Sequence, residues 1–240
     1  MIKSAGLTNV IFARIKWLYA IIVIFSGMTM MIATFYLFPK PYAVKFSAWF
    51  IRLLVFIPVR VKGTPDPDAQ MFLVNHQSDI DIGVMETITS KDLAWVAKKE
   101  LFDVPFFGLV VRLPKDIALE RESKTALVKL IKECKDRLDH GRAITIFPEG
   151  TRTETGKMKP FKAGAKMVAD KFSLKVQPVV LIATAKHFSN KRKIFHSGTI
   201  TAIYLDSFVA DKSNPEWLNE TRDKMQRMYD EVLANMPQYH

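Results

Sequence analysis

Apolar residues are spread unevenly along the 240-residue chain, and the longest uninterrupted apolar stretch lies near the N-terminus. Residues 17–38 carry no charge, and as a helix they would be about 33 Å long, close to the hydrocarbon thickness of a bilayer. The stretch is too long for the apolar region of a cleaved signal peptide, and no small-residue cleavage pattern follows it. Pro39 and Pro41 predict the end of this helix.

A second helix is predicted over residues 42–59, which are apolar apart from Lys45 and Arg52. These two cations are seven residues apart and therefore share one helical face. A cationic amphipathic helix without acidic residues is typical of the membrane interface, where each cation near anionic headgroups contributes about 1 kcal/mol. We therefore expect Lys45 and Arg52 to face lipid headgroups.

Two membrane topologies fit the N-terminal pattern. Either the first helix spans the bilayer, or both helices form a hairpin within one leaflet, which is the topology that we favour. Cations flank the first stretch on both sides, so charge does not set its orientation. The alternative of a core helix in a soluble protein is disfavoured by the long uncharged run and the absence of acidic residues before Asp66.

Beyond residue 68, short β-rich runs alternate with helical patterns. The expected strands are residues 71–75, 94–97, 117–119, 143–147, 176–182 and 200–205. The expected helices are residues 123–140, residues 163–172, and one that begins after the capping residue Asn214 and Pro215. This alternation predicts an α/β fold, with a central, mostly mixed β-sheet flanked by helices. Residues 61–68 read as a linker, so we expect a membrane-associated two-helix motif over 1–62 and an α/β domain over 63–240.

Charge is concentrated in the same N-terminal quarter. The net charge is +11, and eight cations but no acidic residue precede Asp66. Because the surplus surrounds apolar segments, we expect membrane lipids as partners and no nucleic acid. The single cysteine, Cys134, excludes an intrachain disulfide and a cysteine-based zinc site.

A histidine and an aspartate follow the first predicted strand of the domain. His76 and Asp81 are five residues apart, so one continuous helix would turn them about 140° away from each other. They can meet if His76 lies in the strand-to-helix turn, Ser78 caps the helix and Asp81 stands in its first turn. Asp81 would then orient the imidazole, which leaves the other ring nitrogen as a base. Ser78 and Asp81 also fit a plain capping box without catalysis. No cysteine or further histidine gathers here, so we expect no metal site.

A turn rich in functional side chains follows the strand predicted at 143–147. Arg152 suits a phosphate because its planar guanidinium makes paired hydrogen bonds, and Glu149 suits a hydroxyl. Ligands of α/β proteins bind beyond the carboxyl ends of strands, which is where these residues stand. The alternative is an ordinary surface turn with an ion pair.

Other predicted strands also end in cations. Lys98 and Lys99 follow the strand at 94–97, and Arg121 follows the strand at 117–119. Together these side chains predict an anion-binding mouth at one edge of the sheet.

Several segments resemble the conserved blocks of the glycerolipid acyltransferases. Residues 75–81 (NHQSDID) resemble the H-x-x-x-x-D block, and residues 147–152 (FPEGTR) resemble the third block in the form typical of 1-acyl-sn-glycerol-3-phosphate acyltransferases. Residues 97–102, 105–108, 159–165 and 176–179 are also similar to family segments, and the likeness covers about residues 70–185 in the family order. The second block departs at Lys115, where glycine is usual, and at Ala118, where a larger apolar residue is frequent, while Arg121 is kept.

This resemblance implies acyl transfer from acyl-CoA or acyl carrier protein to the free hydroxyl of 1-acyl-sn-glycerol 3-phosphate, which forms phosphatidic acid. His76 would be the general base and Asp81 its orienting partner. The implied substrate-binding residues are Lys98, Lys99, Arg121, Glu149, Gly150, Thr151 and Arg152. No cofactor and no covalent acyl-enzyme are implied.

The same resemblance implies a membrane-associated enzyme, with its catalytic domain on the cytosolic face of the inner or cytoplasmic membrane. Two alternatives stay open. A related acyltransferase would use another acceptor, such as glycerol 3-phosphate or another lysophospholipid, which the altered second block allows. A non-catalytic lipid carrier would use the same basic mouth, although the intact pair of His76 and Asp81 argues against it.

Overall fold

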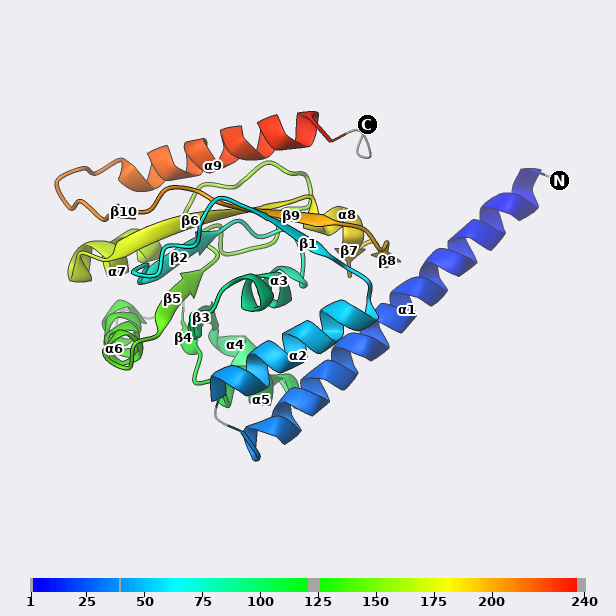
Figure 1. Cartoon of the computed structure of the whole chain (residues 1–240), viewed down its shortest axis with the longest axis horizontal. Coiled ribbons are helices and arrows are strands. Elements are labelled where there is room, and N and C mark those ends of the chain that lie inside the picture. The colour runs from blue at the N-terminus through cyan, green and yellow to red at the C-terminus, as the bar shows by residue number, and fades with distance from the viewer. Residues whose placement is uncertain (1, 39, 121–125, 237–240) are drawn as a thin grey trace.

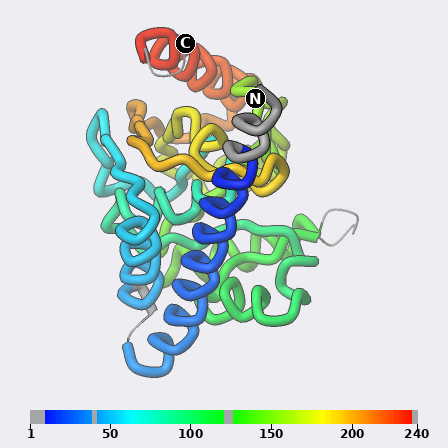
Figure 2. Tube along the Cα trace, turned by 90° about the vertical axis from the view of Figure 1, so that its right-hand side faces the viewer, coloured from blue at the N-terminus to red at the C-terminus, as the bar shows by residue number. Residues whose placement is uncertain are grey.

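The computed structural model describes residues 2–38, 40–120 and 126–236. Its first two helices, α1 (Ile2–Phe35) and α2 (Lys40–Leu54), lie side by side as a hairpin (Figures 1 and 2). The helix α1 begins well before the expected start at residue 17, and α2 ends five residues before the expected residue 59. Within α1, residues Val10–Phe35 are long and apolar enough to cross a membrane, which indicates membrane association.

The body of the chain is built on one mixed sheet, as the sequence predicts. Its strands are β1 (Val59–Lys62), β2 (Met71–Val74), β3 (Leu93–Lys98), β4 (Ile117–Leu119), β5 (Ala143–Ile146), β6 (Lys175–Ile182), β9 (Ile200–Tyr204) and β10 (Phe208–Val209). The order is β1-β9-β6-β2-β5-β3-β4, with β10 on β6. The strands from β6 to β4 run parallel, whereas β9 and β10 are antiparallel to β6. Because β1 already pairs with β9, the sheet begins at Val59, inside the segment expected to belong to the membrane motif.

Helices cover both faces of this sheet. They are α3 (Asp81–Ile88), α4 (Lys99–Phe102), α5 (Phe107–Arg112), α6 (Ala126–Asp139), α7 (Ala163–Phe172), α8 (Thr184–His187) and α9 (Trp217–Ala234). One apolar core packs α6, α7 and α9 on the sheet through residues such as Leu130, Val168 and Met225. A second core includes Val23 of α1 and Val84 of α3 on the opposite face. Figure 1 shows the same separation, with α9 above the sheet and α1 to α3 below it.

The parallel strands determine where the site is built. The strands β2, β5, β3 and β4 are neighbours with one direction, so their carboxyl ends meet at one edge of the sheet. The segments after β2 and β5 carry His76 and Glu149, and β3 ends at Lys98. Motifs that are 73 residues apart in the sequence are thereby brought into contact.

Lys45 and Arg52 of α2 face the protein, so the prediction that these two cations face lipid headgroups was wrong. The Lys45 ammonium donates to the Thr89 carbonyl at 2.8 Å and lies 3.7 Å from the Glu86 carboxylate. The Arg52 guanidinium donates to Thr87 Oγ1 at 3.0 Å. The carboxyl end of α3 carries partial negative charge, which favours cations there. The large apolar side chains of α2, such as Trp49, are exposed instead.

Candidate active site

The central feature of the site is a histidine–aspartate pair in the geometry that the spacing predicts. His76 follows β2, and Asp81 is the first residue of α3. The distance from His76 Nδ1 to Asp81 Oδ2 is 2.9 Å. Asp81 is fully buried, whereas the His76 side chain is 16% exposed. A buried carboxylate thus holds an imidazole that solvent or a substrate can still reach.

The turn that joins the pair is organised mainly by Asp81, while Ser78 Oγ accepts a long hydrogen bond from the Ile80 amide at 3.4 Å. Asp81 Oδ2 also accepts from the backbone amides of Gln77 at 2.7 Å and Ser78 at 2.8 Å. Ile80 stands at the start of α3 without a side-chain cap, and the Ser78 hydroxyl donates to the Phe188 carbonyl at 2.6 Å. The expectation of Ser78 as the helix cap was therefore wrong. The carboxylate orients both the imidazole and the backbone that carries it.

An aromatic stack covers one face of the imidazole. The His76 and Phe147 rings lie 3.9 Å apart, centroid to centroid, with an interplanar angle of 11°. Phe147 in turn stacks on Trp95 of β3 at 5.0 Å. With Nδ1 bonded to Asp81, Nε2 is the nitrogen available to a substrate. The arrangement fits a general base with a fixed tautomer.

Glu149 is buried, and both oxygens of its carboxylate accept hydrogen bonds from within the protein. Its Oε1 accepts from the His76 backbone amide at 2.8 Å, and its Oε2 accepts from Thr153 Oγ1 at 2.9 Å and from the Lys159 amide at 3.0 Å. Burial raises the pKa of its carboxyl, and the hydrogen bonds act in the opposite direction. Only 2% of the residue is exposed. The sequence-based expectation of direct contact with a hydroxyl does not match this burial.

The remaining residues of the turn after β5 lie on an exposed, charged part of the protein surface. Arg152 and Thr151 are exposed, and the Arg152 guanidinium forms an ion pair with Asp79 of the turn after His76. Gly150 has a φ of +66°, in the left-handed region that glycine adopts without strain. The ion pair joins the two motif turns, so Arg152 lies on the same side of the sheet edge as the turn that carries His76.

The lysines at the end of β3 lie at this sheet edge as well. Lys98 and Lys99 are exposed, and the Lys99 ammonium lies 3.0 Å from Glu120 Oε1. The hydrogen bond to Glu120 raises the pKa of Lys99. Arg121, the cation expected after β4, lies outside the described residues.

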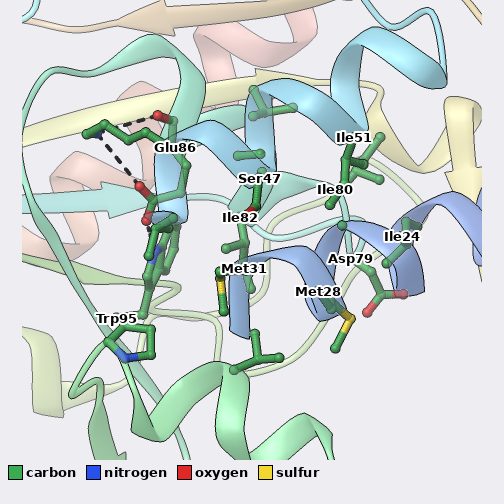
Figure 3. A pocket seen from close by; sticks show the side chains of 18 of the residues that line it. Ile24, Met28, Met31, Ser47, Ile51, Asp79, Ile80, Ile82, Glu86 and Trp95 are labelled. Carbon is green, nitrogen blue, oxygen red and sulfur yellow. Dashed lines mark hydrogen bonds and ion pairs between the residues drawn. The ribbon is translucent and has the colours of Figure 1, made fainter. Parts of the chain in front are cut away.

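A cavity of about 270 Å³ lies between the helical hairpin and the domain (Figure 3). Its wall is mostly apolar and comes from α1, α2, α3, β3 and α5, with Met28, Ile51 and Phe107 as examples. Asp79 and Trp95 also belong to the wall. The cavity therefore adjoins the partner of Arg152 and the stack that covers His76. Sequence reasoning missed it because its wall comes from segments that are distant along the chain.

The single cysteine is not placed to act as a nucleophile. Cys134 is buried in α6, and burial raises its pKa to about 12, which makes its thiol a poor nucleophile. Over residues 2–38, 40–120 and 126–236, no group of three or more histidine, cysteine, aspartate or glutamate side chains is placed to hold a metal ion.

Comparisons with known proteins agree with this geometry. The family model described as Acyltransferase matches residues 58–182. A 1-acyl-sn-glycerol-3-phosphate acyltransferase of Helicobacter pylori is 41% identical over 168 residues, which are 70% of this chain and 71% of that protein. The enzyme of the same name from Pseudomonas aeruginosa is 29% identical over 80% of this chain and 75% of its own length.

The fold is shared with a solved structure. The crystal structure of the 1-acyl-sn-glycerophosphate acyltransferase from Thermotoga maritima matches 92% of this chain and 96% of that chain, with a TM-score of 0.75 and 23% sequence identity. The family model covers half of the chain, and the Helicobacter relative exceeds 30% identity over more than two thirds of it. The chain therefore belongs to the acyltransferase family, in the group of the 1-acyl-sn-glycerol-3-phosphate acyltransferases.

Proposed function

We propose that His76 and Asp81 carry the acyl transfer by which this enzyme makes phosphatidic acid. The activity follows from the relatives, which are 1-acyl-sn-glycerol-3-phosphate acyltransferases. The assignment of the catalytic residues rests on the 2.9 Å contact between His76 Nδ1 and Asp81 Oδ2, at the sheet edge that also carries Arg152. Thiol release from acyl-CoA that depends on added lysophosphatidic acid tests the activity. Release without acceptor would instead indicate a thioesterase.

The mechanism uses the imidazole twice. His76 Nε2 takes the proton of the acceptor hydroxyl while the hydroxyl oxygen attacks the thioester carbonyl. Asp81 accepts from Nδ1–H, which fixes the tautomer and stabilises the imidazolium that forms. When the tetrahedral intermediate collapses, the carbon–sulfur bond breaks and the imidazolium returns the proton to the departing thiolate. The products are the new ester and a free thiol, with no covalent acyl-enzyme.

The acceptor phosphate is assigned to the exposed cations at the sheet edge. Arg152 provides the guanidinium, with Lys98 or Lys99 and the residues Gly150 and Thr151 beside it. Its ion pair with Asp79 is about half exposed on both sides, and such pairs contribute little and exchange readily. Arg121 keeps its proposed phosphate role on the family resemblance alone. For Glu149 we propose an indirect role, in which it holds the His76 backbone.

Arg152→Ala is expected to raise the acceptor KM by about 10- to 100-fold, because hydrogen bonds to a charged phosphate are among the stronger ones. The donor KM should change by less than about threefold, because the proposal assigns Arg152 to the acceptor phosphate alone. Steady-state kinetics with each substrate varied in turn measure both constants. Arg222→Ala is the matched control, because Arg222 pairs with a surface aspartate on α9. An equal rise of both KM values would remove Arg152 from the acceptor site.

The apolar cavity is proposed to hold an acyl chain. Its wall offers almost only carbon atoms, which favour burial of hydrocarbon. It adjoins Asp79, the partner of Arg152, so a chain in the cavity and a phosphate on Arg152 would flank the imidazole. The hairpin of α1 and α2 forms one side of the wall, so a lipid would enter from the membrane side.

Gly83→Phe is expected to shift the preferred acyl chain to shorter lengths. Gly83 lines the cavity on α3, and a Cβ atom added there meets no atom within 4 Å. The bond from the backbone to the new side chain is therefore not obstructed, and the ring is expected to take up cavity volume. Competition between thioesters of different chain length, and between lysophosphatidates of different chain length, measures the shift. Gly83→Ala is the control, and an unchanged profile for Gly83→Phe would disprove the cavity assignment.

For the membrane we propose a hairpin within one leaflet. Large apolar side chains on the outer surfaces of α1 and α2 are exposed, including Phe12, Leu18, Ile22, Phe46, Trp49 and Leu53. The helix α1 also packs on the domain, where Phe25 stacks on Phe106 at 5.9 Å. This packing favours residues 1–62 as a motif that rests on the domain at the cytosolic face of the cytoplasmic membrane. As the acyl donor we propose acyl-CoA or acyl carrier protein. The lipids of the surrounding membrane are further partners.

A further inference from the structure

The helix α3 carries a second buried carboxylate, one turn and a half beyond Asp81. Glu86 is 5% exposed, and its Oε1 accepts from Trp95 Nε1 at 2.8 Å. Figure 3 shows Glu86 and Trp95 next to each other in the cavity wall. Glu86 is thus placed to favour one orientation of the indole, because the N–H of a buried tryptophan requires a hydrogen-bond partner.

The indole is coupled to the proposed base through the aromatic stack. Trp95 packs on Phe147 at 5.0 Å, and Phe147 packs on His76 at 3.9 Å. The Trp95 backbone amide is held separately, by Asp116 Oδ1 at 3.2 Å. The imidazole is therefore held at its edge by Asp81 and on its face by a stack that ends on Glu86. Asp81 and Glu86 both belong to α3. This short helix therefore holds the imidazole in two ways, directly through Asp81 and indirectly through the stack.

The negative charge of Glu86 is compensated from the membrane hairpin. Lys45 of α2 lies 3.7 Å from Glu86 Oε2 and also donates to the carbonyl of Thr89. A carboxylate buried in an apolar wall is costly unless a cation accompanies it. Lys45 thus helps to order the carboxylate that accepts from the indole, and this contact exists only while α2 is docked on α3.

We propose that Glu86 is a positioning residue for acyl transfer, which holds the stack of Trp95, Phe147 and His76, and that Lys45 makes this support depend on the docking of α2. The inference rests on the proposed role of His76 as the base. A proton transfer is sensitive to small displacements of the base. A loosened stack is therefore expected to lower kcat more than it weakens the binding of either substrate.

Steady-state kinetics test the proposal. Glu86→Leu is expected to lower kcat by about 30-fold, with both KM values changed by less than about twofold. Glu86→Gln keeps an oxygen for Trp95 Nε1 and should restore most of the loss. Trp95→Phe keeps the stack but lacks the Nε1 donor, so adding Glu86→Leu to it should lower kcat little further. Lys45→Met is expected to lower kcat by about 10-fold.

The C-terminal core supplies a matched control. Asp170 of α7 accepts from Trp217 Nε1 at 2.8 Å and pairs with Lys166 at 2.7 Å, which is the same arrangement remote from the catalytic histidine. Asp170→Leu should lower the Tm but leave kcat per folded enzyme unchanged.

The proposal is overturned if Glu86→Leu affects kcat no more than Asp170→Leu, or if the effects of Trp95→Phe and Glu86→Leu are additive. An unchanged kcat for Lys45→Met overturns the role of α2. His76→Ala, measured in parallel, separates these outcomes from a failure of the proposed mechanism.

Discussion

His76→Ala is expected to lower kcat by about 10²- to 10⁴-fold, the range that a positioned general base contributes. The imidazole is the group that takes the hydroxyl proton, and alanine leaves nothing in its place. Loss of the ring also removes its stacking on Phe147 at the end of the aromatic stack, but the backbone amide remains bonded to Glu149. Acceptor-dependent thiol release by purified enzyme in lipid or detergent measures the effect, with vesicle binding and Tm as checks on the fold.

His140→Ala is the control for this substitution. His140 follows α6, its side chain is 70% exposed, and its Nδ1 lies 2.6 Å from the Asp136 carbonyl, so its loss should leave kcat unchanged. Transfer at the normal rate by folded His76→Ala enzyme would rule out the mechanism, while the membership of the family would stand on the sequence comparison alone.

Asp81→Asn is expected to lower kcat by about 10²- to 10⁴-fold as well, with KM values little changed. Asparagine has the same shape, and its amide oxygen can still accept from the backbone amides of Gln77 and Ser78. The negative charge that stabilises the imidazolium is lost in either orientation of the amide. Turnover and Tm measured together separate the loss of charge from a loss of fold.

Asp206→Asn serves as the control for Asp81→Asn, because Asp206 is fully exposed. If Asp81→Asn kept the turnover of the unmodified enzyme, the carboxylate would be a structural feature of the turn.

The contact between His76 and Asp81 was predictable from the sequence because its geometry is local. A strand followed by a tight turn places His76 and Asp81 within reach of each other, whatever surrounds them. The contact between the turns after β2 and β5 also followed from the pattern, since parallel strands end at the same edge. The role of Glu149 did not follow, because its partners include the Lys159 amide and the Thr153 hydroxyl, which no periodicity indicates.

The errors arose where a residue's partner lies far along the chain. Helical spacing correctly placed Lys45 and Arg52 on one face of α2. It could not show that α3, about 40 residues later, would lie against that face and supply carbonyls and a carboxylate. The strand β1 was missed for a similar reason. Its four residues are mostly exposed, and they form a strand because the edge of β9 is available to them.

The hairpin of α1 and α2 is more than an anchor, since it completes the wall of the cavity that we propose for the acyl chain. A shortened chain that starts at Val59 would keep the sheet and the catalytic pair, yet its cavity would open to water and Glu86 would lose its cation. Removing the anchor to obtain a soluble enzyme would therefore sacrifice substrate selection together with membrane affinity. In evolution, exchange of the hairpin between relatives offers a route to new chain-length preferences without any change in the catalytic motifs.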